Sequence, residues 1–402
     1  LMNMLDPTAI ADPSNYKKED IKDLYVRRFR KDVLRDLQSN VKERDTKDVN
    51  CNATLAEERV FAQLKDLKLP NTDSKAKAGQ LFKTTLAKSL LSSPMAALET
   101  VRNRLNSLRL SPIDSSEDES ALRELECLLK EINISDFSKY QRMLELIKLD
   151  WSWKGKDSND RILIFTSRRE TQRFLVDNLA DDLGLKAEEV VGIDGSMQDV
   201  SLNNVVEKFA QEKDELRILI ATEVASEGIN LHYLCHRLVH FDIPWSLMTL
   251  QQRNGRIDRY GQKKQPQIRY LLTQSINEGM GDADKILRLL IEKDQQAQQN
   301  IGDPSVFLKL FDEEKEEEEI SRVFEENDFS SLEKRMNDNE KVVLQKSNEI
   351  NLFEQMFGIN SSETSDNNAS DPLAISKFKK KPQYSLYPSL WNYVNCALEA
   401  EA

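Results

Sequence analysis

The chain has 402 residues, of which 39% are hydrophobic and 31% are charged. This length allows two or three domains, and the composition is typical of a soluble protein with a buried core. No apolar run approaches the roughly 18 residues that span a bilayer, so no membrane segment is expected. Four cysteines without a Cys-x-x-Cys pair predict reduced thiols and a cytoplasmic protein.

The net charge of −12 argues against nucleic-acid binding, but the positive charges are concentrated locally. Residues 22–35 hold six Lys or Arg against two acids, a local charge of +4, and residues 251–270 hold six against one, a local charge of +5. Local patches contact phosphates, whereas net charge mainly sets solubility and long-range steering. The distribution therefore favours a nucleic-acid or phosphate ligand.

The first part of the chain has a helical pattern. Residues 81–150 show helix-like spacing of apolar residues with few β-branched runs. The spacing is broken at Ser92-Ser93-Pro94 and again at Ser111-Pro112. We therefore expect a bundle of helices ahead of the next region.

Five short apolar runs follow, separated by amphipathic stretches. Continuous β-branched runs separated by helices predict an α/β fold, with a parallel sheet that helices cover on both faces. Such sheets place ligands at the carboxyl ends of their strands. The predicted strands are residues 161–165, 190–193, 217–220, 238–241 and 268–272.

The last part of the chain is charged and helical in pattern over residues 282–355, and residues 359–372 have the composition of a polar linker. Seven of the eight residues at 312–319 are acidic. A solvated helix face explains this run most simply. An autoinhibitory element that masks the basic groove is the alternative.

Residues 251–262 carry the strongest chemical signal. Arg253, Arg256 and Arg259 recur every third residue, so on a helix or tight turn they are expected to project from one flank. Gly255 lacks a side chain, which would let another surface approach closely. Arginine offers a charged planar fork to phosphate oxygens and suits the charge that develops during phosphoryl transfer. A basic solvated helix face is the alternative interpretation.

Polar side chains follow each predicted strand. Hydroxyls and backbone amides at strand-to-helix turns bind phosphates, although each cluster alone is explained equally well by a helix cap or a backbone requirement. The clusters are Thr166-Ser167-Arg168, Asp194-Gly195-Ser196, residues 221–231 with Thr222, Ser226, Glu227 and Gly228, and Asp242-Ile243-Pro244-Trp245.

The three histidines, His232, His236 and His240, are spaced by four, which could place metal ligands on one helix face. However, residues 237–241 read as a buried strand, which would break that face, so no metal site is expected. Trp245 is expected to pack between residues 221–231 and the helix of residues 251–262 rather than to stack on a base.

Together these segments resemble a known family. Gln252, Gly255, Arg256 and Arg259 fill the pattern Gln-x-x-Gly-Arg-x-x-Arg, which resembles motif VI of superfamily-2 helicases. The flanking Arg253 and residues 260–262 look like its Swi/Snf version. Residues 162–168 resemble motif IV, and residues 192–196 resemble the glycine turn before the next helix. Residues 221–231 resemble motif V. The resemblance implies a RecA-like second lobe of a Swi/Snf-type ATPase over roughly residues 150–275.

The resemblance also suggests a branch of the family. Residues 24–33 are similar to the segment that closes the first lobe, and residues 90–99 and Asp258 look like the bacterial branch. That branch includes the RNA-polymerase-associated ATPase and proteins of phage-defence operons. The implied domains are residues 1–70 as the end of the first lobe and a connector, 71–150 as a helical insertion, 151–280 as the second lobe, and 281–402 as a charged helical extension.

By this resemblance, Arg256 and Arg259 would reach the γ-phosphate of an ATP held by the first lobe, and Gln252 would link the motif to the nucleotide. Arg253 and Gly255 would belong to the same nucleotide side, with Glu227 and Gly228 near the ribose. The DNA backbone would be contacted by Thr166, Ser167, Arg168, Gly195, Ser196, Thr222 and Ser226.

The phosphate-binding loop Gly-x-x-x-x-Gly-Lys-Thr/Ser does not occur, because the only Gly-Lys pair, Gly155-Lys156, lacks its other residues. ATP and Mg²⁺ would therefore be held mainly by a first lobe outside this chain. That lobe could lie upstream in the same polypeptide or in another subunit, and a first residue Leu1 favours the upstream position.

The expected function is an ATP-dependent motor on double-stranded DNA, in which this chain supplies the arginine-finger lobe. RNA polymerase and other defence-system proteins are further partners that the resemblance suggests. A non-catalytic docking module for protein or nucleic acid is the alternative, and an RNA helicase lobe fits the motif VI flanks less well.

Overall fold

The computed structural model describes residues 43–67, 73–109, 116–222, 229–276, 278–298, 304–310 and 312–357. The basic segment at residues 22–35, the expected closing segment of the first lobe and the polar linker lie outside these ranges. Most of motif V, including Ser226, Glu227 and Gly228, also lies outside them. The chain divides into two compact units, residues 1–346 and 347–402, and the sheet lies in the first.

Six parallel strands form one sheet in the order β1-β6-β5-β2-β4-β3. The five predicted strands are all present, although β5 begins three residues earlier than expected and β6 extends beyond its prediction at both ends. The sheet and its covering helices have the RecA-like fold. The strands are β1 (Asp45–Asn52), β2 (Arg161–Phe165), β3 (Val190–Ile193), β4 (Ile218–Ala221), β5 (Cys235–His240) and β6 (Gln267–Gln274).

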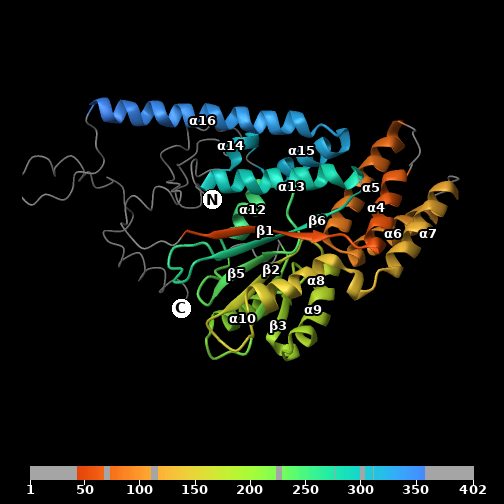
Figure 1. Cartoon of the computed structure of the whole chain (residues 1–402), viewed down its shortest axis with the longest axis horizontal. Coiled ribbons are helices and arrows are strands. Elements are labelled where there is room, and N and C mark those ends of the chain that lie inside the picture. Colours follow the sequence, from red (N-terminus) through yellow and green to blue (C-terminus); the bar gives the residue numbers. More distant parts are fainter. Residues whose placement is uncertain are drawn as a thin grey trace, which may run out of the picture. The chain divides into compact units, whose positions relative to one another are not determined.

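Helices precede, separate and follow these strands (Figure 1). None of the described helices is both long and apolar enough to cross a lipid bilayer. The helices are α4 (Leu55–Asp66), α5 (Asp73–Ser92), α6 (Pro94–Arg109), α7 (Ser116–Glu131), α8 (Ser138–Glu145), α9 (Arg169–Leu183), α10 (Asp199–Ala210), α12 (Leu247–Asn254), α13 (Glu278–Gln296), α14 (Ser305–Leu308), α15 (Glu313–Glu326) and α16 (Phe329–Phe357).

Local sequence explains where several of these helices begin and end. Thr54 and Glu57 form a capping box at the start of α4, so each side chain satisfies a backbone amide of the first turn. Gly184 ends α9 with φ of 67°, a left-handed conformation that glycine adopts without steric cost. The helix therefore ends at Leu183, and β3 begins at Val190 after a short connection.

The middle of the sheet is buried on both faces. All five residues of β2 and all four of β4 are buried, as continuous apolar runs predict. Helices α8 and α9 lie on one side of the sheet, and α12 and α13 lie on the other (Figure 1). Each fully buried aliphatic side chain contributes roughly 1.5–3 kcal/mol relative to an exposed one. These strands therefore form a rigid platform for the segments at their ends.

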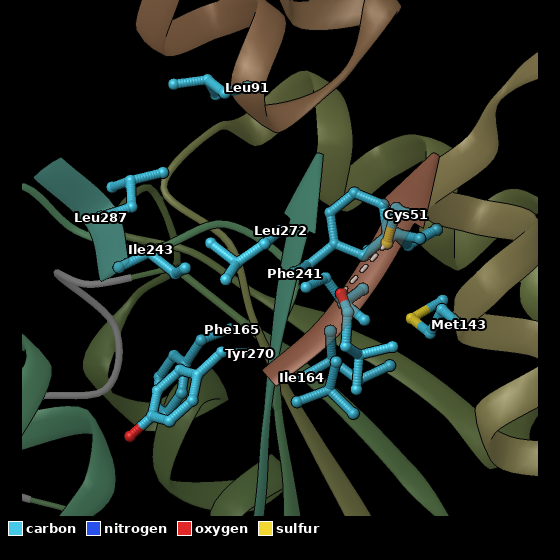
Figure 2. Packing of buried hydrophobic residues seen from close by; sticks show 14 of the residues in the cluster. Cys51, Leu91, Met143, Ile164, Phe165, Phe241, Ile243, Tyr270, Leu272 and Leu287 are labelled. Carbon is cyan, nitrogen blue, oxygen red and sulfur yellow. Dashed lines mark hydrogen bonds between the residues drawn. The ribbon is translucent and has the colours of Figure 1, made fainter. Parts of the chain in front are cut away.

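The core joins parts of the chain that are far apart in sequence. Figure 2 shows Met143 of α8, Leu91 of α5 and Leu287 of α13 around the same strands. His240 on β5 stacks on Phe165 at 6.2 Å and on Tyr270 at 4.8 Å between ring centroids. Side chains from before, within and after the central sheet therefore share one core.

The strand β1 was not predicted. It is an edge strand that pairs with β6 in parallel register, with Asp45 opposite Gln267 and Asn52 opposite Gln274. Only Val49 and Cys51 of β1 are buried, and these alternate residues lie on the same face of the strand. The sheet thus includes residues that sequence alone assigned to a connector.

Candidate functional site

The segment expected to be motif VI is half helix and half turn. The helix α12 begins after Ser246 and ends at Asn254, and Gly255 closes it with φ of −64°. This φ is available to any residue, and a Cβ at Gly255 would come within 3.3 Å of the Gln251 carbonyl. Close packing within its own turn, rather than backbone strain, therefore favours glycine here. Whether another surface also approaches it stays a prediction.

The three arginines do not project from one flank, contrary to the expectation. Arg253 is the last basic residue of α12 and is only 1% exposed, whereas Arg256 is partly buried and Arg259 is exposed in the turns that follow. The helix ends between the first and second arginine, so their spacing of three does not align them. Arg253 thus belongs to the interior, and its predicted contact with nucleotide is not tested.

Arg256 and Arg259 both contact residues near the end of the predicted motif V. The Arg256 guanidinium donates to the Ile229 carbonyl at 3.2 Å, and Arg259 donates to the side-chain oxygen of Asn230. Among the described residues, no carboxylate lies within ion-pairing distance of Arg259. The exposed Arg259 fork is therefore chemically suited to an anionic ligand.

Gln262 holds the same two segments together. Its amide nitrogen donates to the carbonyls of His232, Cys235 and Ile257, at 3.1, 2.9 and 3.1 Å. Next to it, Gly261 adopts φ of 92°, and a Cβ there would lie 3.5 Å from the His232 ring. This position needs glycine because L-residues rarely adopt that conformation. Sequence analysis grouped Gly261 and Gln262 with motif VI but gave them no role.

A buried carboxylate joins the expected motifs IV and VI. Asp242, which follows β5 after Phe241, accepts hydrogen bonds from the Thr166 hydroxyl at 2.6 Å and from the Ser167 amide at 2.7 Å. It also accepts one from the Ser92 hydroxyl at 2.6 Å and pairs with Arg253. Burial disfavours the charge, but Arg253 and these hydroxyls outweigh it and keep the pKa of Asp242 below its ordinary value.

The residues predicted to contact DNA differ in how exposed they are to solvent. Thr166 is fully buried and Thr222 is 6% exposed, so neither offers its hydroxyl to a ligand in this arrangement. Gly195 and Ser196 lie in an exposed turn, where the Ser196 amide and hydroxyl bind Asp194. Ser167 and Arg168 line a cavity. Of the described members of the predicted DNA-contact set, only some are therefore accessible.

That cavity, of about 180 Å³, lies at the carboxyl ends of β2 and β5. Lys88 of α5 and Lys139 of α8 line it together with Ser167 and Arg168. Lys139 is 3% exposed, and burial lowers its pKa. Asp242 and Glu317 also line the cavity, so its cations are partly neutralised. Sequence analysis missed both lysines, because no local pattern relates α5 and α8 to the strand ends.

Trp245 closes one side of this cavity. Its side chain is buried, as expected, but its ring packs on Phe324 of α15 at 5.3 Å and under the Lys88 ammonium at 4.6 Å. Most of motif V lies outside the described ranges, so the expected contact with it stays a prediction. Lys88 lies on a helix before the central strands in sequence, and Phe324 lies on a helix after them. No local sequence pattern reveals such contacts.

A second buried network fixes the end of α12. The Asn254 amide bridges His240, Tyr270 and Asp294, at distances of 2.8, 3.1 and 3.0 Å, and Arg44 pairs with Asp294 at 2.5 Å. Burial lowers the pKa of His240 to about 3, so the ring is neutral. His240 thus acts as a hydrogen-bonding core residue. The described part of the chain contains no cluster of three metal-ligating side chains.

The solved structures that match this chain include two ATPase domains. The C-terminal part of the Fun30 ATPase domain covers 72% of this chain and 98% of its own, with 15% identity and a TM-score of 0.42. The Sulfolobus solfataricus SWI2/SNF2 ATPase core domain covers 73% of this chain and 52% of its own, with 19% identity and a TM-score of 0.39.

Sequence comparison identifies the class. Residues 138–261 match the family described as helicase conserved C-terminal domain. The uncharacterized ATP-dependent helicase YqhH of Bacillus subtilis is 28% identical over 277 residues, which are 68% of this chain and 44% of YqhH. The RNA polymerase-associated protein RapA of Photobacterium profundum is 30% identical over 152 residues, which are 36% of this chain and 14% of RapA.

The chain therefore carries a helicase C-terminal domain. Over the matched stretches it is homologous to YqhH and RapA. It spans less than half the length of either relative. The family assignment made from motifs IV to VI is thus confirmed.

Proposed function

We propose that this chain is the arginine-finger lobe of an ATP-driven motor that moves on double-stranded DNA. The observation that carries the proposal is the arrangement of Arg256 and Arg259 beside Ile229 and Asn230. Arg259 is exposed and has no carboxylate partner among the described residues, so a phosphate can meet its guanidinium. A lobe that only docks a partner does not require this pair.

The nucleotide is shared between two lobes in this proposal. Arg256 and Arg259 supply positive charge to the γ-phosphate, and Gln252 lies one helical turn before Arg256 on the same segment. ATP and Mg²⁺ are held mainly by a first lobe, because the 402 residues contain no phosphate-binding loop. Bound ATP supplies the phosphoryl group, and this chain supplies charge stabilisation and orientation.

DNA is proposed to lie along the accessible members of the predicted set. Ser167 and Arg168 face the cavity at the strand ends, and Gly195 and Ser196 lie in an exposed turn. Backbone amides, hydroxyls and a guanidinium are groups that bind DNA phosphates without reading sequence. RNA polymerase, which the name of RapA mentions, and phage-defence proteins remain predicted partners.

The decisive experiment replaces Arg256 in the complete ATPase, with the phosphate-binding lobe present. Arg256→Ala should lower the catalytic rate by about 10³-fold or more, on the scale of other arginine fingers, while apparent ATP affinity changes far less. Arg173→Ala, an exposed arginine on α9, is the matched control and should change neither value. A parallel loss of rate and affinity would make Arg256 a binding residue instead.

Movement on DNA needs a separate assay. A triplex-displacement measurement on duplex DNA should show ATP-dependent release by the complete protein and none by its Arg256→Ala variant. DNA binding without any ATP-dependent displacement would favour the docking-module alternative.

A further inference from the structure

The acidic run at residues 312–319 is a solvated helix face only in part. It forms the start of α15, and four of its glutamates make specific contacts with other elements. Glu316 is fully buried, whereas Glu314 and Glu318 on the same helix are exposed. Burying a carboxylate is costly unless it is hydrogen-bonded, so the contacts of Glu316 require an explanation.

Glu316 lies at the beginning of α12. One of its carboxylate oxygens accepts the Ser246 hydroxyl at 2.8 Å and the Met248 amide at 3.1 Å. The first amides of a helix have no partner within the helix, and negative charge is favourable at that end. Ser246 in turn accepts the Thr249 amide at 3.2 Å. Glu316 and Ser246 thus cap α12 jointly, and a local sequence pattern would show only the serine.

Glu313 contacts the other end of the same helix face. The Gln252 amide nitrogen donates to one oxygen of Glu313, and the Thr249 hydroxyl donates to the other at 3.2 Å. Gln252 is the motif VI glutamine, and its side chain is otherwise exposed. Glu313 therefore determines the direction in which this amide points.

Contacts on its other sides hold α15 in place. Glu317 pairs with Lys88 at 2.7 Å, and Glu325 accepts the Thr84 hydroxyl at 2.7 Å, both from α5. Glu319 pairs with Arg335 of α16 at 2.5 Å. A helix bound to its neighbours on several sides can act as a fixed support for α12.

We propose that Glu316 and Glu313 are positioning residues for motif VI, so that α15 completes the ATPase site from outside the matched helicase domain. Glu316 fixes where α12 begins, and Glu313 orients Gln252. Asn254 fixes the opposite end of α12 through its buried network, so that the helix is held at both ends. The proposal rests on the proposed function of Gln252 and Arg256 in ATP hydrolysis.

Two measurements test this proposal together. In the complete ATPase, Glu316→Ala and Glu313→Ala should each lower kcat at least about 10-fold with KM changed less than about threefold, because the nucleotide itself is held elsewhere. Glu316→Gln should recover most of the rate, since an amide oxygen can accept the same two hydrogen bonds. Glu314→Gln and Glu318→Gln, exposed on the same helix, should leave both values unchanged.

Amide hydrogen exchange of the chain gives a readout that does not depend on ATP hydrolysis. In Glu316→Ala the amides of Met248 and Thr249 should exchange at least about 10-fold faster, while the amides of β2 keep their wild-type rates. Faster exchange throughout β2 would indicate general destabilisation and would overturn the positioning role. So would unchanged α12 exchange, or a Glu316→Gln variant as slow as Glu316→Ala.

The outcomes separate the two proposals. If Arg256→Ala abolishes turnover but Glu316→Ala does not reduce it, the positioning role is wrong and the proposed function stands. If Arg256→Ala has no effect, the proposed function fails, and the effect of Glu316→Ala on α12 exchange then decides whether α15 supports this helix.

Discussion

The guanidinium of Arg253 donates to the Asp242 carbonyl at 3.0 Å and lies 3.7 Å from the Asp242 carboxylate. Both side chains are almost completely buried, and the guanidinium also donates to the Ser167 hydroxyl at 2.8 Å. This pair ties α12 to the ends of β2 and β5. The first arginine of motif VI therefore anchors the segment, while the second and third are left at or near the surface.

Removing this arginine should destabilise the protein strongly. Arg253→Met leaves the Asp242 charge buried without its partner, and such losses cost about 3–5 kcal/mol of unfolding free energy. Urea unfolding measures the change. Arg173→Met, on the exposed face of α9, should stay within about 0.5 kcal/mol of wild type.

A second substitution tests the cause. If the buried charge is the reason for the loss, then Asp242→Asn in the Arg253→Met background should recover part of the unfolding free energy. Equal stability of the single and double variants would show that lost packing, rather than the unpaired carboxylate, dominates.

Stability should fall as the solution becomes acidic. Burial, and then the charge of Arg253, lowers the pKa of His240 to about 3, and burial lowers that of His236 to about 4. The unfolded chain therefore binds more protons than the folded chain below pH about 6.5. Each histidine should contribute up to about 1.4 kcal/mol of lost unfolding free energy per pH unit as pH falls from about 6.5 toward 4.

Urea unfolding across this pH range checks the histidine contribution. His240→Gln should reduce the slope of unfolding free energy against pH, whatever its effect on stability at neutral pH. Leu149→Ala, an exposed and non-titrating change, should keep the wild-type slope. An unchanged slope in His240→Gln would mean that this ring has the same pKa in the folded protein as in the unfolded chain.

The three hydrogen bonds of the Gln262 amide predict that removing this side chain lowers the free energy of unfolding. Gln262→Ala leaves the carbonyls of His232, Cys235 and Ile257 without this donor, which should cost about 1–3 kcal/mol of unfolding free energy. Thermal or urea unfolding measures it. Gln274→Ala, at the exposed end of β6, is the control, and an equal effect in both variants would remove any special role for Gln262.

The chain alone should hydrolyse ATP negligibly and bind it weakly. Its 402 residues contain neither a phosphate-binding loop nor an Asp-Glu-x-His motif for Mg²⁺, and motif VI alone supplies only part of the site. A steady-state phosphate-release assay checks this, with the complete ATPase as the positive control. A turnover of several per second from the chain alone would contradict the division of the site between two lobes.

Much of the central sheet could be predicted because its strands are continuous apolar runs. The run at Arg161–Phe165 is buried at every position, which is possible only in a strand covered on both faces. The strand β1 escaped prediction because an edge strand needs few apolar residues, and only Val49 and Cys51 of its eight are buried. Its place is set by pairing with β6, which lies more than 200 residues later.

The sequence by itself determined the family, because Gln252, Gly255, Arg256 and Arg259 carry it in their order and spacing. It did not determine which arginine is accessible: that depends on where α12 ends and on the buried carboxylate of Asp242, which holds Arg253 inside. Nor could it relate Glu316 to the start of α12, 68 residues away from Met248. Spacing along a chain specifies local periodicity, whereas burial and hydrogen-bond partners arise only when distant segments pack together.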